Sequence, residues 1–146
     1  MRPVHVVVMI LVCALAVRAG PVEEVQEVAK ARAQAYEAGN LDAFMATWAE
    51  NAVLIPSRSP FRIESKEAIR AYYASIFQNY PIHKLLVRPT MYRTFGDNVV
   101  VTNGYQDLVW VDKAGTVTQI SLRTSGVWIK LNGKWLMVDY HLSKGP

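Results

Sequence analysis

The stretch from Val127 to Ser143 constrains the fold more than any other part of this sequence, and it reads VWIKLNGKWLMVDYHLS. Two apolar, aromatic-rich runs flank the dipeptide Asn132-Gly133. That dipeptide favours a type I′ turn, because both central residues of such a turn need positive φ. The stretch is therefore predicted to be a β-hairpin whose two-residue loop pairs Leu131 with Lys134.

This register divides the hairpin between two faces, because directly opposed residues of antiparallel strands share a face. An uninterrupted ladder has three further opposed pairs, which are Trp128 with Met137, Gly126 with Asp139 and Thr124 with His141. One face then carries Trp128, Trp135, Met137, Asp139 and His141, and the other carries Val127, Ile129, Leu136, Val138 and Tyr140. Both faces are largely apolar, so we expect helices to cover one face and a second subunit to cover the other.

The order of the remaining elements indicates an α+β domain. Apolar residues at helical spacing predict helices over residues 22–38, 41–49 and 66–78. A short apolar strand is expected at 52–56, followed by a loop at 57–63. From residue 82 onward the pattern predicts four long strands, at 82–94, 99–111, 116–130 and 134–143. Helices followed by such a meander pack on one face of a curved sheet.

The first 19 residues are predicted to be a secretory signal peptide. Residues 6–17 form an apolar run that is too short to span a bilayer comfortably, and Ala19 offers a small residue before Gly20. Cleavage there leaves one domain over residues 20–146 and indicates a secreted or periplasmic protein without stable membrane association. An uncleaved membrane anchor is the alternative. The only cysteine, Cys13, lies in the leader, so the expected mature domain has no thiol for a disulfide, for catalysis or for a metal.

The composition argues against nucleic-acid binding. The formal net charge is +4, and removing Arg2 and Arg18 with the leader leaves 14 basic against 12 acidic residues. The basic residues are also scattered, whereas a phosphate backbone requires a clustered patch. His83 and His141 lack the spacing of a metal-ligand set, and there is no glycine-rich phosphate loop, so neither a metal nor a cofactor is expected.

Four segments carry a family resemblance: AGNLDAF at 38–44, PIHKLLVRP at 81–89, the strand that ends in WVDKAG at 110–115, and GVWIKLNGKWLMVDYHLSKG at 126–145. With them the chain resembles the nuclear transport factor 2-like superfamily, which includes SnoaL-like and ketosteroid isomerase-like proteins. Within it, the chain is most similar to the association domain of calcium/calmodulin-dependent protein kinase II. The resemblance implies a cone-shaped, cystatin-like α+β fold, with three N-terminal helices packed on a curved antiparallel sheet.

The resemblance also implies self-association and a ligand pocket. In the family the outer face of the sheet packs against a second copy, and the residues expected at that interface are Val127, Ile129, Val138 and Tyr140. The pocket lies between the concave face of the sheet and the helices, and its expected lining is Trp48, Tyr73, Gln106, Leu108, Trp110, Thr124, Trp128 and Met137. Two arginines of the association domain point into this cavity, but their positions are matched here by Gln106 and Gly126, so the family's anion-binding arginines are absent.

Asp139 and His141 are the candidate catalytic pair. The two residues are two positions apart on one strand, so their side chains share a face. A carboxylate beside an imidazole can orient the imidazole as a general base. The alternative is a histidine at a strand end that serves packing or a subunit contact. Arg58 or Arg62 could bind an anion at the mouth of the cavity, or each could be an ordinary solvated charge. The carboxylate base of ketosteroid isomerases has no counterpart, because residues 53–56 include no acid.

Three hypotheses about function follow, and whether the protein is an enzyme stays open. The first is an exported, self-associating SnoaL-like domain, at least a homodimer, whose apolar pocket binds a small hydrophobic ligand without catalysis. The second is an isomerase, cyclase or hydratase that uses His141 and Asp139 for proton transfer. The third is a pure oligomerisation scaffold, since the superfamily includes enzymes, carriers and assembly domains.

Overall fold

The computed structural model describes residues 19–145. Nearly all of the predicted leader, Cys13 included, therefore lies outside the described residues. Within the described part, no helix combines the length and the apolar character needed to cross a membrane.

Three helices occupy the first half of the described chain: α1 (Pro21–Glu37), α2 (Leu41–Met45) and α3 (Lys66–Asn79). Gly39 follows α1 with a φ of 66°, the left-handed conformation that commonly ends a helix. The side chains of Asn40 and Ser65 accept hydrogen bonds from backbone N–H groups in the first turns of α2 and α3. These caps satisfy donors that a helix start would otherwise leave unpaired.

The predicted second helix is wrong in its last turn. Helix α2 stops at Met45, and Trp48 opens the first strand. The reason is pairing with the end of the chain, because the backbone N–H of Met137 donates to the carbonyl of Thr47 at 2.8 Å. Tertiary pairing of this kind readily overrides a weak local helix propensity.

Six strands form one sheet in the order β2-β1-β6-β5-β4-β3. Their bounds are β1 (Trp48–Ile55), β2 (Ile63–Glu64), β3 (Ile82–Thr94), β4 (Val99–Val111), β5 (Val117–Leu131) and β6 (Lys134–Lys144). The four long strands match the prediction closely, whereas β2 occupies part of the segment predicted as a loop. All neighbouring strands are antiparallel except β1 and β6, which are parallel, so the sheet is mixed rather than purely antiparallel.

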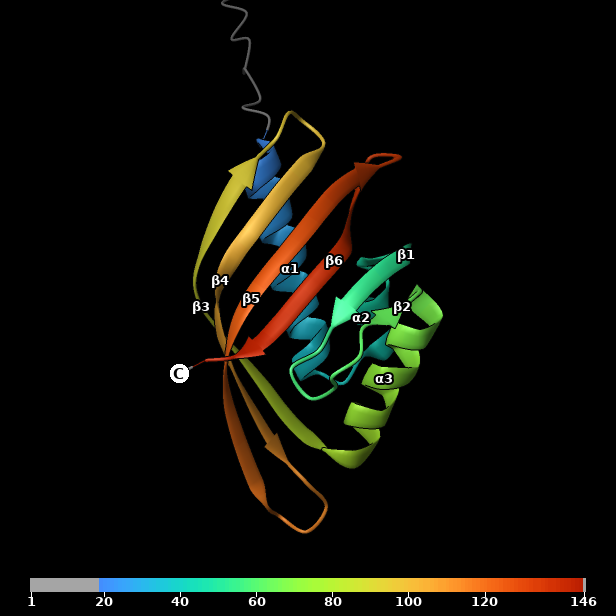
Figure 1. The fold of residues 1–146 in the computed structure, drawn as a ribbon, viewed down its shortest axis with the longest axis vertical. Helices are drawn as coiled ribbons and strands as arrows, with labels where there is room; N and C mark the ends of the chain where they lie inside the picture. Colours follow the sequence, from blue (N-terminus) through green and yellow to red (C-terminus); the bar gives the residue numbers. More distant parts are fainter. Residues whose placement is uncertain (1–18, 146) are drawn as a thin grey trace, which may run out of the picture.

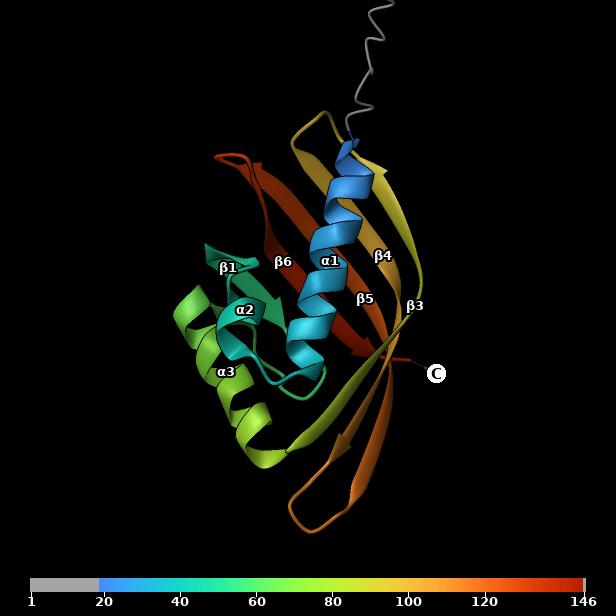
Figure 2. The same cartoon turned by 180° about the vertical axis from the view of Figure 1, so that it is seen from behind.

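The helices cover one face of the sheet. Figure 1 looks onto the other, outer face, and Figure 2 shows α1 lying along the inner face with α2 and α3 beside it. The far end of the β4–β5 hairpin extends beyond the helices in both views. The core fills the space between the helices and the sheet, and its largest fully buried side chains include Trp48, Trp110, Phe44, Met45 and Leu54.

The terminal hairpin has the predicted turn. Asn132 and Gly133 have φ values of 49° and 77°, the positive values that a type I′ turn requires. Leu131 is paired with Lys134, as the two-residue loop predicts.

A β-bulge at Val138 changes which face the end of β6 presents. The predicted register holds up to Met137, but Gly126 then lies opposite Tyr140 instead of Asp139. One extra residue in one strand reverses the alternation of inward and outward side chains beyond it.

The bulge reverses three predicted orientations, those of Asp139, Tyr140 and His141. Tyr140 and Leu142 are buried against the inner face, although Tyr140 is predicted to lie on the outer face. Asp139 is half-buried and His141 is exposed, and both face outward although they are predicted to face the pocket. Thr124 consequently lies opposite Leu142 and not opposite His141.

Candidate functional site

Helix α1 carries a cation on its buried face. Val25, Ala29, Arg32 and Tyr36 follow one another at intervals of four, three and four residues, so they share one side of the helix. Arg32 is accordingly only 7% exposed. The position of this arginine on an otherwise apolar stripe is the sequence signal that could have identified it.

Three aromatic rings surround the guanidinium of Arg32. Its central carbon lies 4.5 Å from the ring centre of Phe44 on α2, 4.9 Å from that of Tyr140 on β6 and 5.0 Å from that of Trp48 on β1. Each ring face attracts a cation electrostatically, and more strongly where water is excluded. Helix α1, helix α2 and the two parallel strands therefore converge on one charged group, and we call these four residues the Arg32 cage.

The Arg32 cage contains donors without acceptors. The Nε and Nη2 atoms of Arg32 and the indole nitrogen of Trp48 are buried and have no hydrogen-bond partner among the described residues. No carboxylate within residues 19–145 forms an ion pair with Arg32. Buried charges in proteins are normally paired, because an uncompensated one is strongly unfavourable.

Two adjoining cavities meet at Arg32. The first has a volume of about 30 Å³ and lies between the helices and the sheet, where its lining includes Tyr36, Phe44, Tyr73, Ile76, Leu108 and Trp110. The second has a volume of about 60 Å³, and its lining includes Thr90, Tyr92, Thr102, Thr124, Trp128 and Met137. Both cavities are also lined by Arg32, Leu85, Gln106 and Tyr140. Their walls are largely apolar, as in ligand sites, but each volume holds only one or a few water molecules and is far below the roughly 300 Å³ of a typical ligand pocket, so an organic ligand would have to widen them.

Two hydrogen bonds join polar side chains of the lining. The Tyr140 hydroxyl donates to Oε1 of Gln106 at 2.9 Å, and the indole nitrogen of Trp110 donates to the Tyr36 hydroxyl at 2.7 Å. Burial raises the pKa of Tyr36, Tyr73 and Tyr140 above the usual range of a phenol, so these hydroxyls stay protonated at neutral pH. Among the described residues that line either cavity, none carries a carboxylate or an imidazole.

Gly126 makes room for the ring of Tyr140. A Cβ atom at Gly126 would lie 3.2 Å from Cδ2 of Tyr140 and 2.8 Å from Oγ1 of Thr102. A position at which the resemblance implies an arginine in the family is therefore covered by an aromatic ring from the opposite strand. The cation of this pocket comes from α1 instead.

The structure places the residues of the predicted pocket as follows: Tyr73, Leu108 and Trp110 line the first cavity, Thr124, Trp128 and Met137 line the second, and Gln106 lines both. Trp48 lines neither cavity and lies in the Arg32 cage. Sequence reasoning did not include Arg32, Phe44 or Tyr140 in this pocket.

The candidate catalytic pair lies on the other side of the sheet. Asp139 and His141 line neither cavity, because the bulge at Val138 turns both toward the outer face. Val127 and Ile129 are half-buried on that same outer face.

The two candidate arginines of the loop after β1 have separate surroundings. The Arg58 guanidinium lies 4.9 Å from the ring centre of Trp110 and donates to the Tyr80 hydroxyl at 2.9 Å. Arg62 forms an ion pair with Glu64. Neither arginine lines the two cavities.

His83 is a core residue. It is buried, its Nδ1 is hydrogen-bonded to the carbonyl of Tyr80 at 2.8 Å, and its ring stacks on Phe77 with 4.5 Å between the ring centres. Within residues 19–145, no group of three histidines, cysteines or acidic residues is placed to hold a metal ion.

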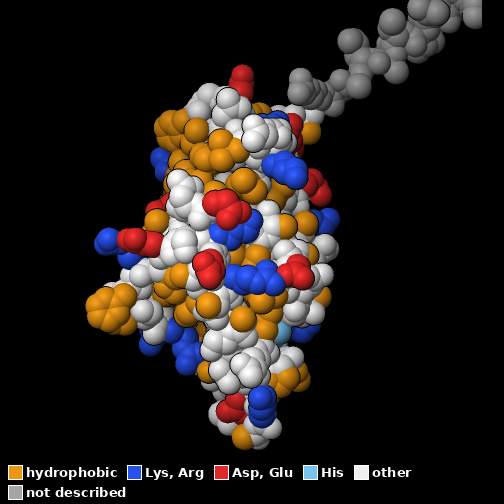
Figure 3. Space-filling view, turned by 90° about the vertical axis from the view of Figure 1, so that its right-hand side faces the viewer, with side chains coloured by type: hydrophobic (Ala, Val, Ile, Leu, Met, Phe, Trp, Pro, Cys, Tyr) orange, Lys and Arg blue, Asp and Glu red, His pale blue; other side chains and the backbone are white. Residues whose placement is uncertain are grey.

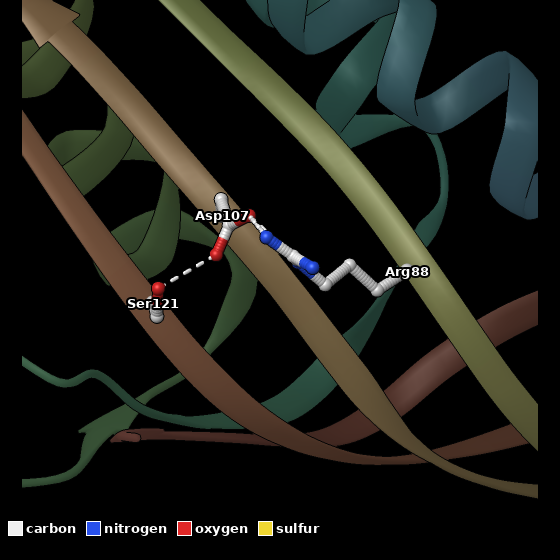
Figure 4. Close-up of polar contacts among 3 residues, drawn as sticks. All are labelled: Arg88, Asp107 and Ser121. Carbon is white, nitrogen blue, oxygen red and sulfur yellow. Dashed lines mark hydrogen bonds and ion pairs between the residues drawn. The ribbon is translucent and has the colours of Figure 1, made fainter. Parts of the chain in front are cut away.

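The outer face has a polar cluster that joins three strands. Figure 4 shows Asp107 on β4 between Arg88 on β3 and Ser121 on β5. Nε of Arg88 donates to the Asp107 carboxylate at 2.7 Å, and the Ser121 hydroxyl donates to it at 2.8 Å. These hydrogen bonds, led by those from Arg88, hold the pKa of the Asp107 carboxyl below its usual range.

Comparison with known proteins identifies the relatives of this chain. Residues 25–145 match the model of a family described as the SnoaL-like domain. No curated protein matches the chain.

Solved structures share the fold. A protein from Xanthomonas campestris, provisionally named as a calcium/calmodulin-dependent protein kinase II association domain, is 26% identical, with 88% of this chain and 94% of that chain covered and a TM-score of 0.77. A nuclear transport factor 2-like superfamily protein from Salmonella enterica is 17% identical, covering 86% and 92%, with a TM-score of 0.78. A provisionally named scytalone dehydratase from Novosphingobium aromaticivorans is 7% identical, covering 86% and 84%, with a TM-score of 0.79. The predicted nuclear transport factor 2-like α+β fold is confirmed.

Proposed function

Since the chain belongs to the SnoaL-like domain family, we propose that it is a self-associating domain that binds a small organic ligand in the two cavities around Arg32. The observation that carries the proposal is the pocket itself. It has apolar and aromatic walls, a few convergent polar groups and a buried charge, which is the usual constitution of a ligand site.

Binding is favoured over proton-transfer catalysis by the chemistry of the lining. Solved structures of this fold include two provisionally named dehydratases, and a dehydration needs a general base close to the substrate. The described lining offers tyrosines whose pKa is raised by burial, one arginine and no carboxylate or imidazole. These groups can hold and orient a ligand, but none of them is a base at neutral pH.

Self-association is proposed to use the outer face of the sheet. Ile82, Leu86 and Met91 lie opposite outward-facing residues of β4 and are 53%, 53% and 61% exposed. With the half-buried Val127 and Ile129, they put five apolar side chains on the outer face beside the polar Arg88–Asp107–Ser121 cluster, and exposed apolar side chains are a feature of interfaces. Figure 3 shows another side of the molecule, where charged side chains lie among the hydrophobic ones.

A second copy is the occupant proposed for the outer face. The solved structure with 26% identity bears the name of an association domain, and the central strands here present apolar residues on both faces. Export through the predicted leader is a further part of the proposal. Mass spectrometry of the N-terminus of protein recovered outside the cytoplasm tests it, since a chain beginning at Gly20 supports export with cleavage and a retained leader contradicts the cleavage. Recovery of the protein from the cytoplasm alone contradicts export.

The ligand proposal is tested by native mass spectrometry of protein purified under gentle conditions, followed by extraction and identification of bound small molecules. A ligand at one equivalent or less per chain is expected, and the Leu108→Trp variant, which fills the first cavity, should lose it. The control is Val109→Trp, which changes the neighbouring residue on the outer face. A ligand retained equally by both variants, or no ligand after screening of a metabolite library against the protein, contradicts the proposal.

A further inference from the structure

We propose that the pocket binds the carboxylate of a small organic acid on the Nε and Nη2 edge of Arg32, an inference that rests on the proposed ligand-binding function.

No described residue of the pocket balances the charge of Arg32. Arg32 is 7% exposed and has no ion-pair partner among the described residues. Phe44, Tyr140 and Trp48 attract the cation through their ring faces but supply no negative charge. An anion entering the pocket would meet a guanidinium that is largely shielded from bulk solvent, where electrostatic attraction is stronger than at the surface.

The free donors of Arg32 have the geometry that a carboxylate requires. The two buried nitrogens without partners, Nε and Nη2, belong to the same edge of the planar guanidinium and point their N–H bonds in parallel. A carboxylate has two oxygens at matching spacing and accepts such a pair of hydrogen bonds. Elsewhere in the chain the same two nitrogens of an arginine also donate to a carboxylate, because Nε and Nη2 of Arg88 both donate to Oδ2 of Asp107.

The number of cations in the lining limits the charge of the ligand. Arg32 is the only cation among the described residues that line either cavity. A ligand with one negative charge is balanced by it, whereas a phosphate or a dicarboxylate would leave charge unpaired in an apolar site. The lining therefore favours a monocarboxylate.

The walls of the two cavities indicate the chemistry of the rest of the ligand. Leu85, Gln106 and Tyr140 line both cavities together with Arg32, so an acid held by Arg32 can extend into either one. Tyr73, Leu108 and Trp110 in the first cavity offer flat, apolar surface, which suits a short alkyl chain or one aromatic ring. The ligand class is thus a small apolar monocarboxylic acid.

The test is isothermal titration of the purified protein at pH 7 with acetate, butyrate and benzoate, each compared with its own primary amide. The amides keep the shape and lose the charge. Wild type is expected to bind at least one acid more tightly than its amide, by about tenfold or more, as a charge-assisted bidentate pair requires. In Arg32→Met that ratio should fall to about one, while Arg123→Met, which removes an exposed cation outside the lining, should keep the wild-type ratio.

Each outcome has one reading. If amides bind wild type as tightly as acids do, the carboxylate inference is overturned while ligand binding in the pocket stands. If no acid binds, the inference is also overturned, and the separate search for a co-purified ligand decides the proposed function. Should Arg32→Met fail to fold, Arg32→Lys takes its place. It keeps the charge but not the paired donors, and an undiminished ratio in it contradicts the bidentate geometry.

Discussion

At the residue scale, Arg32 is the group that most needs an explanation. It lies among apolar residues of α1, and the aromatic cage does not provide an anion for it. Replacing buried charges by apolar groups of similar volume is often neutral or stabilising. A buried unpaired cation therefore fits a functional role better than a role in holding the fold together.

The first prediction concerns the stability of Arg32→Met. Its free energy of unfolding should equal that of wild type or exceed it by about 1 kcal/mol, because methionine fills the space without a charge to desolvate. Urea unfolding measures the difference, with the exposed Arg123→Met as the control. A loss of more than about 2 kcal/mol in Arg32→Met alone would show that the cage depends on the cation.

The second prediction concerns the hydrogen bond between Trp110 and Tyr36. Tyr36→Phe removes the acceptor of the buried Trp110 indole and should lower the free energy of unfolding by about 1–3 kcal/mol. Tyr105→Phe removes a hydroxyl from a residue that is 57% exposed, and it should change stability by less than about 0.5 kcal/mol. Equal effects of the two variants in urea unfolding would rule out a special role for the buried bond.

At the element scale, one inserted residue in β6 decides which side chains enter the pocket. Trp135 and Met137 are buried before the bulge, and Tyr140 and Leu142 are buried after it. These two apolar pairs are out of phase by one residue. The sequence contains that break in alternation, but the break can be assigned to a bulge only when the pairing with β5 is known.

The third prediction concerns the Arg88–Asp107–Ser121 cluster across β3, β4 and β5. The pKa of Asp107 is lowered in the folded state, so its contribution to stability is complete above the unfolded-state pKa of about 4 and is lost as the pH falls further. The stability difference between wild type and Asp107→Asn should therefore be larger at pH 7 than at pH 3. Asp97→Asn, in an exposed turn, is the control, and an Asp107→Asn difference that does not change with pH would contradict the pairing.

The sequence was sufficient for the long elements because their signals are local. Alternating apolar residues and the Asn132-Gly133 turn define β5 and β6 without knowledge of their neighbours. The first residues of β1 and the whole of β2 were not predictable in this way, since both form strands by pairing with distant strands. The wall residues of the site were predictable because they follow the alternation of the strands. Arg32 was not predicted, because it enters the pocket from a helix.

At the scale of the whole molecule, the sheet has helices on one face and exposed apolar side chains on the other. The pocket and the proposed subunit interface therefore lie on opposite faces of the same strands. Ligand binding and self-association can accordingly be tested by separate substitutions.

The fourth prediction is that the wild-type protein is at least dimeric at micromolar concentration and that Leu86→Glu is monomeric. Leu86 lies opposite Asp107 on the outer face, where an added carboxylate would be buried against the second copy. Ala31→Glu adds the same charge to an exposed position of α1 and should remain associated. Analytical ultracentrifugation distinguishes these outcomes, and a monomeric wild type would remove the interface proposal.

The measurement that tests the central claim most directly is a titration followed at the Nε–Hε signal of Arg32 in a ¹⁵N-edited NMR spectrum. The signal is assigned by its absence in Arg32→Met. Benzoate should shift it saturably, while equal concentrations of benzamide should leave it nearly in place, because only the carboxylate brings a negative charge and two acceptor oxygens to Nε and Nη2. An Arg32 signal that does not move although benzoate binds the protein elsewhere would contradict the claim that this buried edge is the ligand site.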